Sequence, residues 1–127
     1  EYGNGKTLTI ITYGNGLYLS LQAKKEIEKK LKKKIKVIDL RWLSDINIQI
    51  LLNAIGTCEN VLIVDECRRT GCHGEGLISN LLSASNKHLN IRLHAAEDSF
   101  ISIGIAATAT LPSKSSIIKH GLELVND

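Results

Sequence analysis

The chain has 127 residues, 43% of them hydrophobic, and a formal net charge of +3 at pH 7. These values indicate one globular domain with a core of ordinary size. No apolar run approaches the roughly 18 residues of a membrane-spanning helix, and the polar, glycine-rich start is unlike a signal peptide. We therefore expect a cytoplasmic protein with no membrane partner. Methionine is absent, which predicts that residues 1–127 are a single domain excised from a longer protein.

The positive charge is concentrated in one segment. Between residues 24 and 36, eight lysines accompany two glutamates, so this segment carries +6 and the rest of the chain −3. Surfaces that bind nucleic acid usually interleave basic residues with aromatic ones, and aromatic residues are only 4% of this chain. The pattern favours a solvated helix face with Glu26–Lys30 and Glu28–Lys32 pairs, and no nucleic-acid partner is expected. A basic nucleic-acid binder stays open as a minor alternative.

Predicted strands and helices alternate along the whole chain. Strands are predicted at 7–13, 35–40, 60–65 and 90–95, from β-branched and apolar runs bounded by polar or glycine residues. Helices are predicted at about 17–32, 44–56, 73–85 and from 113 to the end. The third strand is continuously apolar, as expected when helices cover both faces of a sheet. Repeated alternation predicts an α/β fold with a mostly parallel sheet.

Capping residues set the predicted helix boundaries. Ser44 is the expected N-cap of the second helix and Gly56 its end, while Pro112 and Ser113 start the last helix. Lys24 falls within the apolar stripe of the first helix and would have to snorkel. The residues of that stripe are Leu17, Leu21, Ile27 and Leu31.

The most informative segment is Val61–Glu75, which reads V-L-I-V-D-E-C-R-R-T-G-C-H-G-E. A buried strand ends there in two carboxylates, and two arginines, a turn and the next helix follow. Ligands and partners of open α/β sheets bind at the carboxyl ends of the strands. The segment is therefore a candidate active-site loop or a candidate interface.

Two glycine motifs are incomplete as phosphate-binding loops. Gly14-x-Gly16 follows the first strand, but Leu19 stands where a dinucleotide fingerprint needs its third glycine. The Gly71–Gly76 segment lacks the lysine and hydroxyl residue of a P-loop. Its helix N-terminus, with Arg68 and Arg69, could still hold a carboxylate or phosphate. We favour the alternative that these arginines pair with Asp65, Glu66 or a neighbouring subunit.

No other set of residues completes a catalytic or metal site. The cysteines at 58, 67 and 72 lack zinc-site spacing, and the four histidines lack metal-ligand spacing. Cys72 beside His73 does not by itself make a nucleophile–base pair, because the base must lie close in space and the thiol pKa must be lowered. We expect packing roles for the cysteines and a loop-anchoring role for Glu97 and Asp98.

Several segments, taken in order, resemble the C-terminal domain of the transketolase superfamily. The resemblance covers about residues 6–125 and is closest to the beta subunit, or a fused alpha–beta chain, of the thiamine diphosphate-dependent component of 2-oxo acid dehydrogenases. The segments are I-T-Y-G-N-G (11–16), V-I-D-L-R-W-L (37–43), V-D-E-C-R-R-T-G-C-H (64–73), A-E-D-S-F-I (96–101) and L-P-S (111–113).

The resemblance implies a three-layer α/β fold whose five-stranded sheet is mostly parallel, with one antiparallel strand and helices on both faces. It implies a parent oxidoreductase that decarboxylates a 2-oxo acid, such as pyruvate or a branched-chain one, and passes the acyl group to lipoamide. Thiamine diphosphate and Mg²⁺ would be bound by domains absent from this chain. No catalytic, cofactor-binding or metal-binding residue of the family maps onto it, so the isolated domain is expected to be inactive.

The expected role is therefore assembly. The resemblance implies that the partners are the upstream domains or alpha subunit, a second copy in a homodimer, and the lipoyl acyltransferase core. A free-standing flavodoxin-like or nucleotide-binding module using the two glycine loops is the alternative. The concentrated charge in the 65–75 loop, without evident substrate chemistry, predicts that the loop and the helix at 73–85 form a two-fold interface. The interface candidates are Asp65, Glu66, Arg68, Arg69, His73, Glu75, Glu97 and Asp98.

Overall fold

Strands and helices alternate as the sequence predicts. The structure, a computed structural model, describes all residues from Glu1 to Asp127. The elements are β1 (Thr9–Thr12), α1 (Asn15–Leu31), β2 (Lys36–Asp39), α2 (Ile48–Ile55), β3 (Asn60–Arg68), α3 (His73–Ala84), β4 (Asn90–Ala96), the 3₁₀ helix η1 (Gly104–Ala109) and α4 (Lys114–Asn126). None of the helices combines the length and apolar character that crossing a membrane requires.

The sheet has four strands in the order β2-β1-β3-β4, and all neighbouring pairs are parallel. The expectation of five strands, one of them antiparallel, is wrong. The antiparallel pairing is a single bridge, in which Tyr2 and Val37 exchange hydrogen bonds of 2.8 and 3.0 Å. The pairing stops there because Gly3 turns the chain at φ +87° and Gly5 packs directly on the Lys34 backbone, where a Cβ would lie 2.1 Å away.

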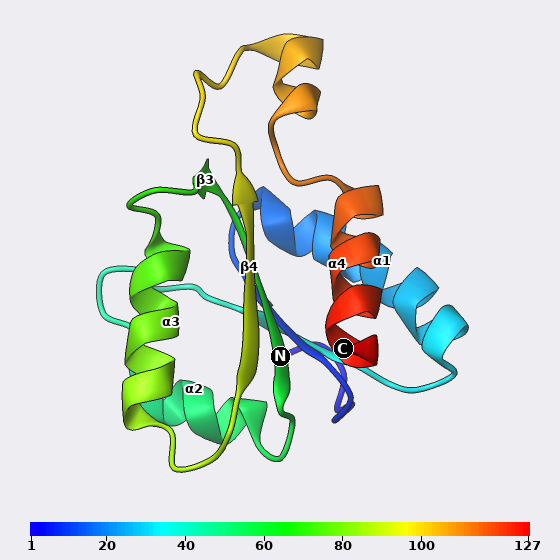
Figure 1. Ribbon diagram of the computed structural model, residues 1–127, viewed down its shortest axis with the longest axis vertical. Coiled ribbons are helices and arrows are strands. Elements are labelled where there is room, and N and C mark those ends of the chain that lie inside the picture. Colours follow the sequence, from blue (N-terminus) through cyan, green and yellow to red (C-terminus); the bar gives the residue numbers. More distant parts are fainter.

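Helices cover both faces of the sheet (Figure 1). One apolar cluster contains Leu51 and Ile55 of α2 and Leu77 and Leu81 of α3. The other cluster joins α1 and α4 to the opposite face. Successive residues of β3 alternate between the two clusters: Val61 and Ile63 lie in the first, and Leu62 and Val64 in the second. This alternation explains why the whole strand is apolar.

One predicted helix cap is wrong. The N-cap of α2 is Asn47, whose side chain accepts a 3.0 Å hydrogen bond from the Ile50 amide, whereas Ser44 lies in the preceding loop. The apolar stripe expected on α1 faces the core: Ile27 is buried, and Leu17, Leu21 and Leu31 are partly buried against the same cluster. The other buried positions of α1 are Gly16, Ser20 and Ala23. Small residues suit this face because α4 lies close to it: a Cβ on Gly121 would meet Ile27 Cδ1 at 3.0 Å.

The lysine-rich segment is organised by Glu28. Its carboxylate pairs with Lys24 at 2.6 Å and Lys34 at 3.3 Å, and it accepts a 3.0 Å hydrogen bond from the Ile35 amide. Burial opposes ionisation of Glu28, but these contacts outweigh it and lower its pKa. The predicted Glu28–Lys32 pair is absent, since Lys32 has left the helix at φ 52°. Only 17% of the Lys24 side chain is exposed, and its ammonium is neutralised by Glu28.

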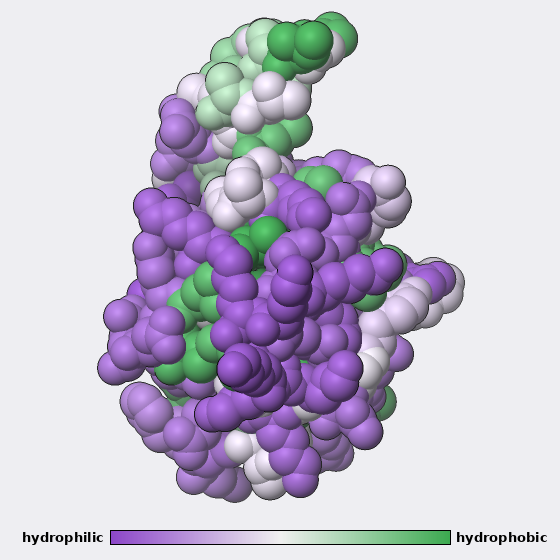
Figure 2. Space-filling view, turned by 90° about the vertical axis from the view of Figure 1, so that its right-hand side faces the viewer, coloured by the Kyte–Doolittle hydropathy of each residue, from purple (hydrophilic) through white to green (hydrophobic).

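Residues 97–110, which we call the arm, leave the body of the domain after β4. Figure 1 shows the arm projecting beyond the end of the sheet with η1 at its tip, and Figure 2 shows apolar surface on the same projection. The Glu97 amide donates to the Thr110 carbonyl at 3.1 Å, which closes the base of the arm. Glycine at 104, with φ +71°, starts η1.

Candidate functional site

The loop singled out by sequence begins with an irregularity in β3. Asp65 pairs with Ala95 of β4, but the next paired residue on β3 is Arg68, opposite Ala96. Residues 66 and 67 therefore bulge out of the ladder. The Cys67 amide loses its ladder partner and donates instead to Oδ1 of Asp65 at 2.8 Å. The Arg69 amide then resumes contact with β4 through the Ala96 carbonyl at 3.1 Å.

Asp65 is a buried carboxylate shared by three structural elements. It has no solvent exposure and also accepts from the Tyr13 hydroxyl at 2.6 Å and the Gly74 amide at 3.0 Å. Burial alone would raise the pKa of Asp65, but the three donors outweigh it and hold the pKa below its ordinary value. Burial and the bond to Asp65 raise the pKa of Tyr13. Asp65 therefore stays ionised and Tyr13 neutral at pH 7.

Asp65 also supplies the cap that α3 lacks from its own sequence. The N-cap residue, Cys72, makes no side-chain capping bond. The Asp65 carboxylate reaches the amide of Gly74 in the first turn instead, where negative charge suits the helix dipole. Gly74 permits this approach, because a Cβ there would lie 2.5 Å from Leu93 Cδ1 and 3.3 Å from Ile63 Cγ2.

The crevice at the topological switch point is closed by the protein's own side chains. In the order β2-β1-β3-β4, the chain reverses its direction across the sheet between β1 and β3, where α/β folds usually bind ligands. The Tyr13–Asp65 bond spans this gap, and Asn15 Nδ2 spans it again by donating to Glu66 at 2.9 Å. The Gly14–Gly16 loop is thus tied to β3 across the switch point, while a cavity of about 440 Å³ remains on its β2 side, lined by Tyr13, Gly14 and Leu17 among others.

The second glycine loop is also used internally. Gly71, at φ +78°, donates its amide to the Glu75 carboxylate at 2.7 Å. With the Gly74 amide bound to Asp65, two of the donors around the start of α3 already have anionic partners inside the domain. An external carboxylate or phosphate would have to displace them.

The predicted interface residues gather at this end of the sheet, but their side chains divide into two groups. Asp65, Glu66, Glu75 and Asp98 accept hydrogen bonds within the domain, and the Asp98 carboxylate binds the Thr70 amide at 2.8 Å and its hydroxyl at 2.7 Å. These bonds, followed by the nearby arginines, lower the pKa of Asp98. Three exposed side chains make no ion pair within 4.0 Å: Arg68, Arg69 and Glu97. The predicted pairing of the arginines with Asp65 or Glu66 is therefore wrong.

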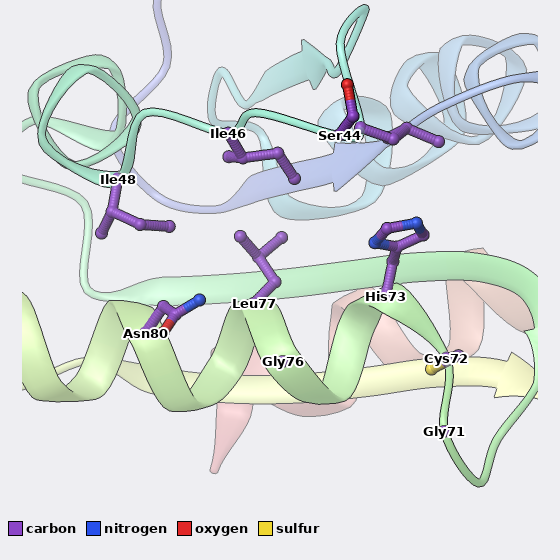
Figure 3. A pocket seen from close by; sticks show the side chains of 10 residues that line it. Ser44, Ile46, Ile48, Gly71, Cys72, His73, Gly76, Leu77 and Asn80 are labelled. Atoms are coloured by element: carbon purple, nitrogen blue, oxygen red, sulfur yellow. The ribbon is translucent and has the colours of Figure 1, made fainter.

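His73, the remaining candidate, lines a cleft of about 350 Å³ between α3 and the loop before α2. Its ring meets Tyr13 edge-on, with centroids 6.2 Å apart. Figure 3 shows His73 and Leu77 pointing across the cleft toward Ser44 and Ile46. None of these residues presents a buried polar atom without a partner. The polar side chains of its lining, Ser44, His73 and Asn80, are exposed and make no hydrogen bond with one another, so they form no nucleophile–base pair.

Two of the three cysteines, Cys58 and Cys72, have the packing role expected from the sequence, and Cys67 does not. Cys58 and Cys72 are buried, Cys67 is exposed, and all three are free thiols. Burial, followed by the charge of Asp65, raises the pKa of Cys72, so its thiol stays protonated. No three His, Cys, Asp or Glu side chains form a cluster that could hold a metal ion.

One polar contact was not predicted from the sequence. His94 Nε2 lies 2.7 Å from Ser116 Oγ, and the His94 and His120 rings are 4.4 Å apart. Burial, followed by the His120 charge, lowers the pKa of His94 to about 4. Ser116 is committed to the capping box of α4: it accepts from the Ser113 amide at 2.8 Å and donates to the Ser113 carbonyl at 2.9 Å. This Ser–His pair is therefore structural. The S-x-x-S spacing of Ser113 and Ser116 indicates the capping box, but no local sequence pattern indicates that His94 contacts Ser116.

Comparison with known families identifies the fold. Residues 3–110 match the model of the transketolase C-terminal domain. The chain belongs to this family. Family membership confirms the resemblance found in the sequence motifs, and the shared segment includes the β3 loop, the closed crevice and the arm.

Curated relatives of the domain are beta subunits of one enzyme. The beta subunit of the pyruvate dehydrogenase E1 component from Staphylococcus aureus strain Mu50 is 27% identical over 94% of this chain and 37% of its own length. The chloroplastic beta-2 subunit of the same component from Arabidopsis thaliana is 34% identical over 72% of this chain and 21% of its own length. The chain thus spans 37% and 21% of the lengths of these two relatives.

A solved structure supports the fold. A split-gene transketolase, described as an inactive beta4 tetramer, superposes with a TM-score of 0.82 over 98% of this chain and 40% of its own chain. Its sequence identity is 17%, so the likeness concerns the fold alone.

Proposed function

We propose that the chain is the assembly domain of a thiamine diphosphate-dependent 2-oxo acid dehydrogenase. The Staphylococcus aureus subunit aligns over 94% of this chain, and this chain covers only 37% of that subunit. The proposal places the rest of the enzyme outside residues 1–127. The parent enzyme would oxidatively decarboxylate a 2-oxo acid and transfer the acyl group to lipoamide.

The observation that carries an assembly role is the closed crevice. Tyr13, Asn15, Asp65 and Glu66 fill the position where a sheet of this type would bind a ligand. The residues present do not fit thiamine diphosphate with Mg²⁺ either, because amides around the start of α3 already bind Asp65 and Glu75. Under this proposal the cofactor belongs to other domains, and we assign no reaction step to this chain.

The charged end of the sheet is the proposed contact with the parent enzyme. Internal hydrogen bonds fix the loop backbone through Asp65, Glu75 and Asp98. Arg68, Arg69 and Glu97 remain exposed and without ion pairs, which suits the polar rim of an interface. The proposed partners are the upstream domains or alpha subunit, a second parent subunit across a two-fold axis, and the lipoyl acyltransferase core.

Calorimetry with thiamine diphosphate and Mg²⁺ tests the cofactor assignment. We expect no heat of binding to the isolated chain; saturable binding at micromolar concentration would overturn the proposal.

Sedimentation of the parent enzyme carrying Arg69→Glu tests the proposed contact at the charged end of the sheet. Lys33→Glu, in the lysine-rich segment, is the matched charge-reversal control. Arg69→Glu should weaken subunit association several-fold because it reverses a charge at the rim of the interface, whereas Lys33→Glu should leave association unchanged. Equal assembly of both variants would remove the charged loop from the interface.

A further inference from the structure

The two outer strands of the sheet differ in how their free edges are protected. On β2, Tyr2 of the same chain closes the edge by exchanging two backbone hydrogen bonds with Val37. No strand lies against the outer edge of β4. Figure 1 shows β4 between α3 and α4, with no other segment crossing in front of it. The sheet therefore ends at β4 with an open edge.

The pairing of β4 with β3 shows which backbone groups face this edge. The Asn90 amide donates to the Glu59 carbonyl at 2.9 Å, so every second residue from Asn90 onward turns its amide and carbonyl toward β3. Ile91, Leu93 and Ala95 therefore turn theirs outward, where the domain supplies no hydrogen-bond partner. Such a row of amides and carbonyls is a template for another extended backbone, whereas a folded surface presents mainly side chains.

Side chains that could protect the edge are held elsewhere. Proteins often hinder pairing at an open edge with charged side chains. On β4, Arg92 is paired with Glu123 at 3.2 Å and with Asp127 at 2.6 Å, both on or next to α4. His94 Nε2 lies 2.7 Å from Ser116 Oγ, also on α4. These contacts hold both side chains on the α4 face of the sheet, so neither protects the edge.

A cavity of about 390 Å³ lies beside the open edge, between β4 and α3. Of its charged lining residues, Glu75 accepts from the Gly71 amide and Arg92 is paired on α4. Arg69 is exposed and has no ion pair. An added strand can therefore place an apolar side chain in the cavity and an acidic one beside Arg69. The apolar lining residues are Ile78, Ile91 and Leu93.

We propose that the open edge of β4 binds an extended segment of a separate polypeptide by strand addition. The backbone of that segment pairs with Ile91, Leu93 and Ala95, one of its apolar side chains enters the cavity, and an acidic side chain pairs with Arg69. In such contacts the main-chain hydrogen bonds supply affinity and the side-chain pockets supply selectivity. The inference goes beyond the proposed function and does not rest on it, because it requires neither a cofactor nor the rest of the parent enzyme.

Hydrogen exchange with residue resolution tests the pairing. The probe is a synthetic peptide as long as β4, which alternates valine with threonine and carries one glutamate. With the peptide at about 1 mM, exchange of the Ile91, Leu93 and Ala95 amides should slow at least about fivefold, because the added strand protects them. The Arg92 and His94 amides face β3 and should keep their rates. This alternation is specific to a strand added at the edge.

Matched controls separate strand addition from other kinds of binding. The same peptide N-methylated at every amide keeps its side chains but donates no hydrogen bond, and it should leave exchange unchanged. Ala95→Pro removes one outward amide and no bond to β3, so it should weaken binding of the unmodified peptide at least about fivefold. Arg69→Gln should weaken the same binding several-fold by removing the charge that pairs with the glutamate. Circular dichroism establishes that both variants keep the fold.

Three results would each overturn the proposal: unchanged exchange of the outward amides, uniform slowing along β4, or equal protection by the methylated peptide. The parent enzyme gives a further test without any peptide. In it the Ile91, Leu93 and Ala95 amides should exchange faster than those of Arg92 and His94. Slow exchange of all five would show that the parent already covers this edge. That result would remove the separate partner and leave the proposed function untouched.

Discussion

The Tyr13 hydroxyl donates a 2.6 Å hydrogen bond to Oδ1 of Asp65 and joins the ends of β1 and β3. The same carboxylate orders the bulge through Cys67 and the start of α3 through Gly74. A segment that resembles an active-site loop in the sequence is thus a closed junction of three elements. The Asp65 side chain is fully buried, and its three hydrogen-bond donors all come from the domain itself.

Asp65→Asn should destabilise the domain by about 2–4 kcal/mol, because an amide cannot accept from all three donors and it loses the charge that strengthens each bond. Tyr13→Phe removes only one donor and should cost about 1 kcal/mol. Urea denaturation at pH 7 measures both changes in the free energy of unfolding. Equal stability of Asp65→Asn and wild type would refute the role given to Asp65.

Asp65 should also make the domain sensitive to acid. Its folded-state pKa lies below the ordinary value of 3.8, so its stabilising effect is present above pH 3.8 and is lost as the pH falls through the folded-state pKa. The free energy of unfolding of the wild type should therefore decline more steeply below about pH 4 than that of Asp65→Asn. Parallel curves for the two proteins would contradict this expectation.

His94 should act in a higher pH range. Its pKa falls from 6.5 in the unfolded chain to about 4 in the folded domain. Below pH 6.5 the unfolded chain is therefore protonated at His94 while the folded domain is not, so the free energy of unfolding declines as the pH falls from 6.5 toward 4. Between pH 7.5 and pH 5 this effect amounts to about 2 kcal/mol. In His94→Gln, which keeps a polar partner for Ser116, most of that decline should disappear from urea titrations. An unchanged pH dependence would count against a neutral His94.

Two glycines of α3 should respond oppositely to alanine. Gly74→Ala places a methyl group 2.5 Å from Leu93 Cδ1, and the overpacking should cost about 1–2 kcal/mol despite the better helix propensity. Gly76 has open space around its Cα, so Gly76→Ala should gain about 0.5–1 kcal/mol. Thermal unfolding of both variants measures the difference; a shift of the same sign in both would show that α3 packs less closely on β4.

Asp98→Ala should release the arm without unfolding the domain, because the lost bonds to Thr70 fasten only its base. Phe100 is the only phenylalanine and is exposed, so chymotrypsin should cleave after it faster in this variant. Glu97→Ala is the control, since Glu97 contributes its backbone amide and not its carboxylate to the base. Equal cleavage of the two variants would contradict the fastening role of Asp98.

The type and boundaries of an element were predictable from the sequence where a local residue pattern determines them. The continuous apolar run of β3 predicted a strand buried on both faces, and Ser113 predicted the start of α4; both predictions are confirmed. The number and direction of the strands were taken from the family resemblance. That expectation failed because Gly3 and Gly5 limit antiparallel pairing to Tyr2.

The candidate site was harder to predict because its contacts join distant parts of the chain. The sequence placed Asp65 at the end of a strand, but its partner Tyr13 lies 52 residues away, and nothing local shows that the two meet. His94 and Ser116 are 22 residues apart and were missed for the same reason. Arg69 lies in an exposed loop as expected, whereas Arg68 is the last residue of β3, and the expected partners of both already accept hydrogen bonds from backbone amides and polar side chains.

The uncharged run from Ser99 to Ser113 has a practical consequence for work with the isolated domain. The arm offers no electrostatic repulsion between molecules, and the net charge of the chain is only +3. Sulfate and phosphate strengthen the burial of apolar surface, so they should salt the domain out at low concentration. Phe100→Asp should raise the solubility of the isolated domain. The apolar arm would therefore decide which salt concentrations are suitable for purifying and storing the protein.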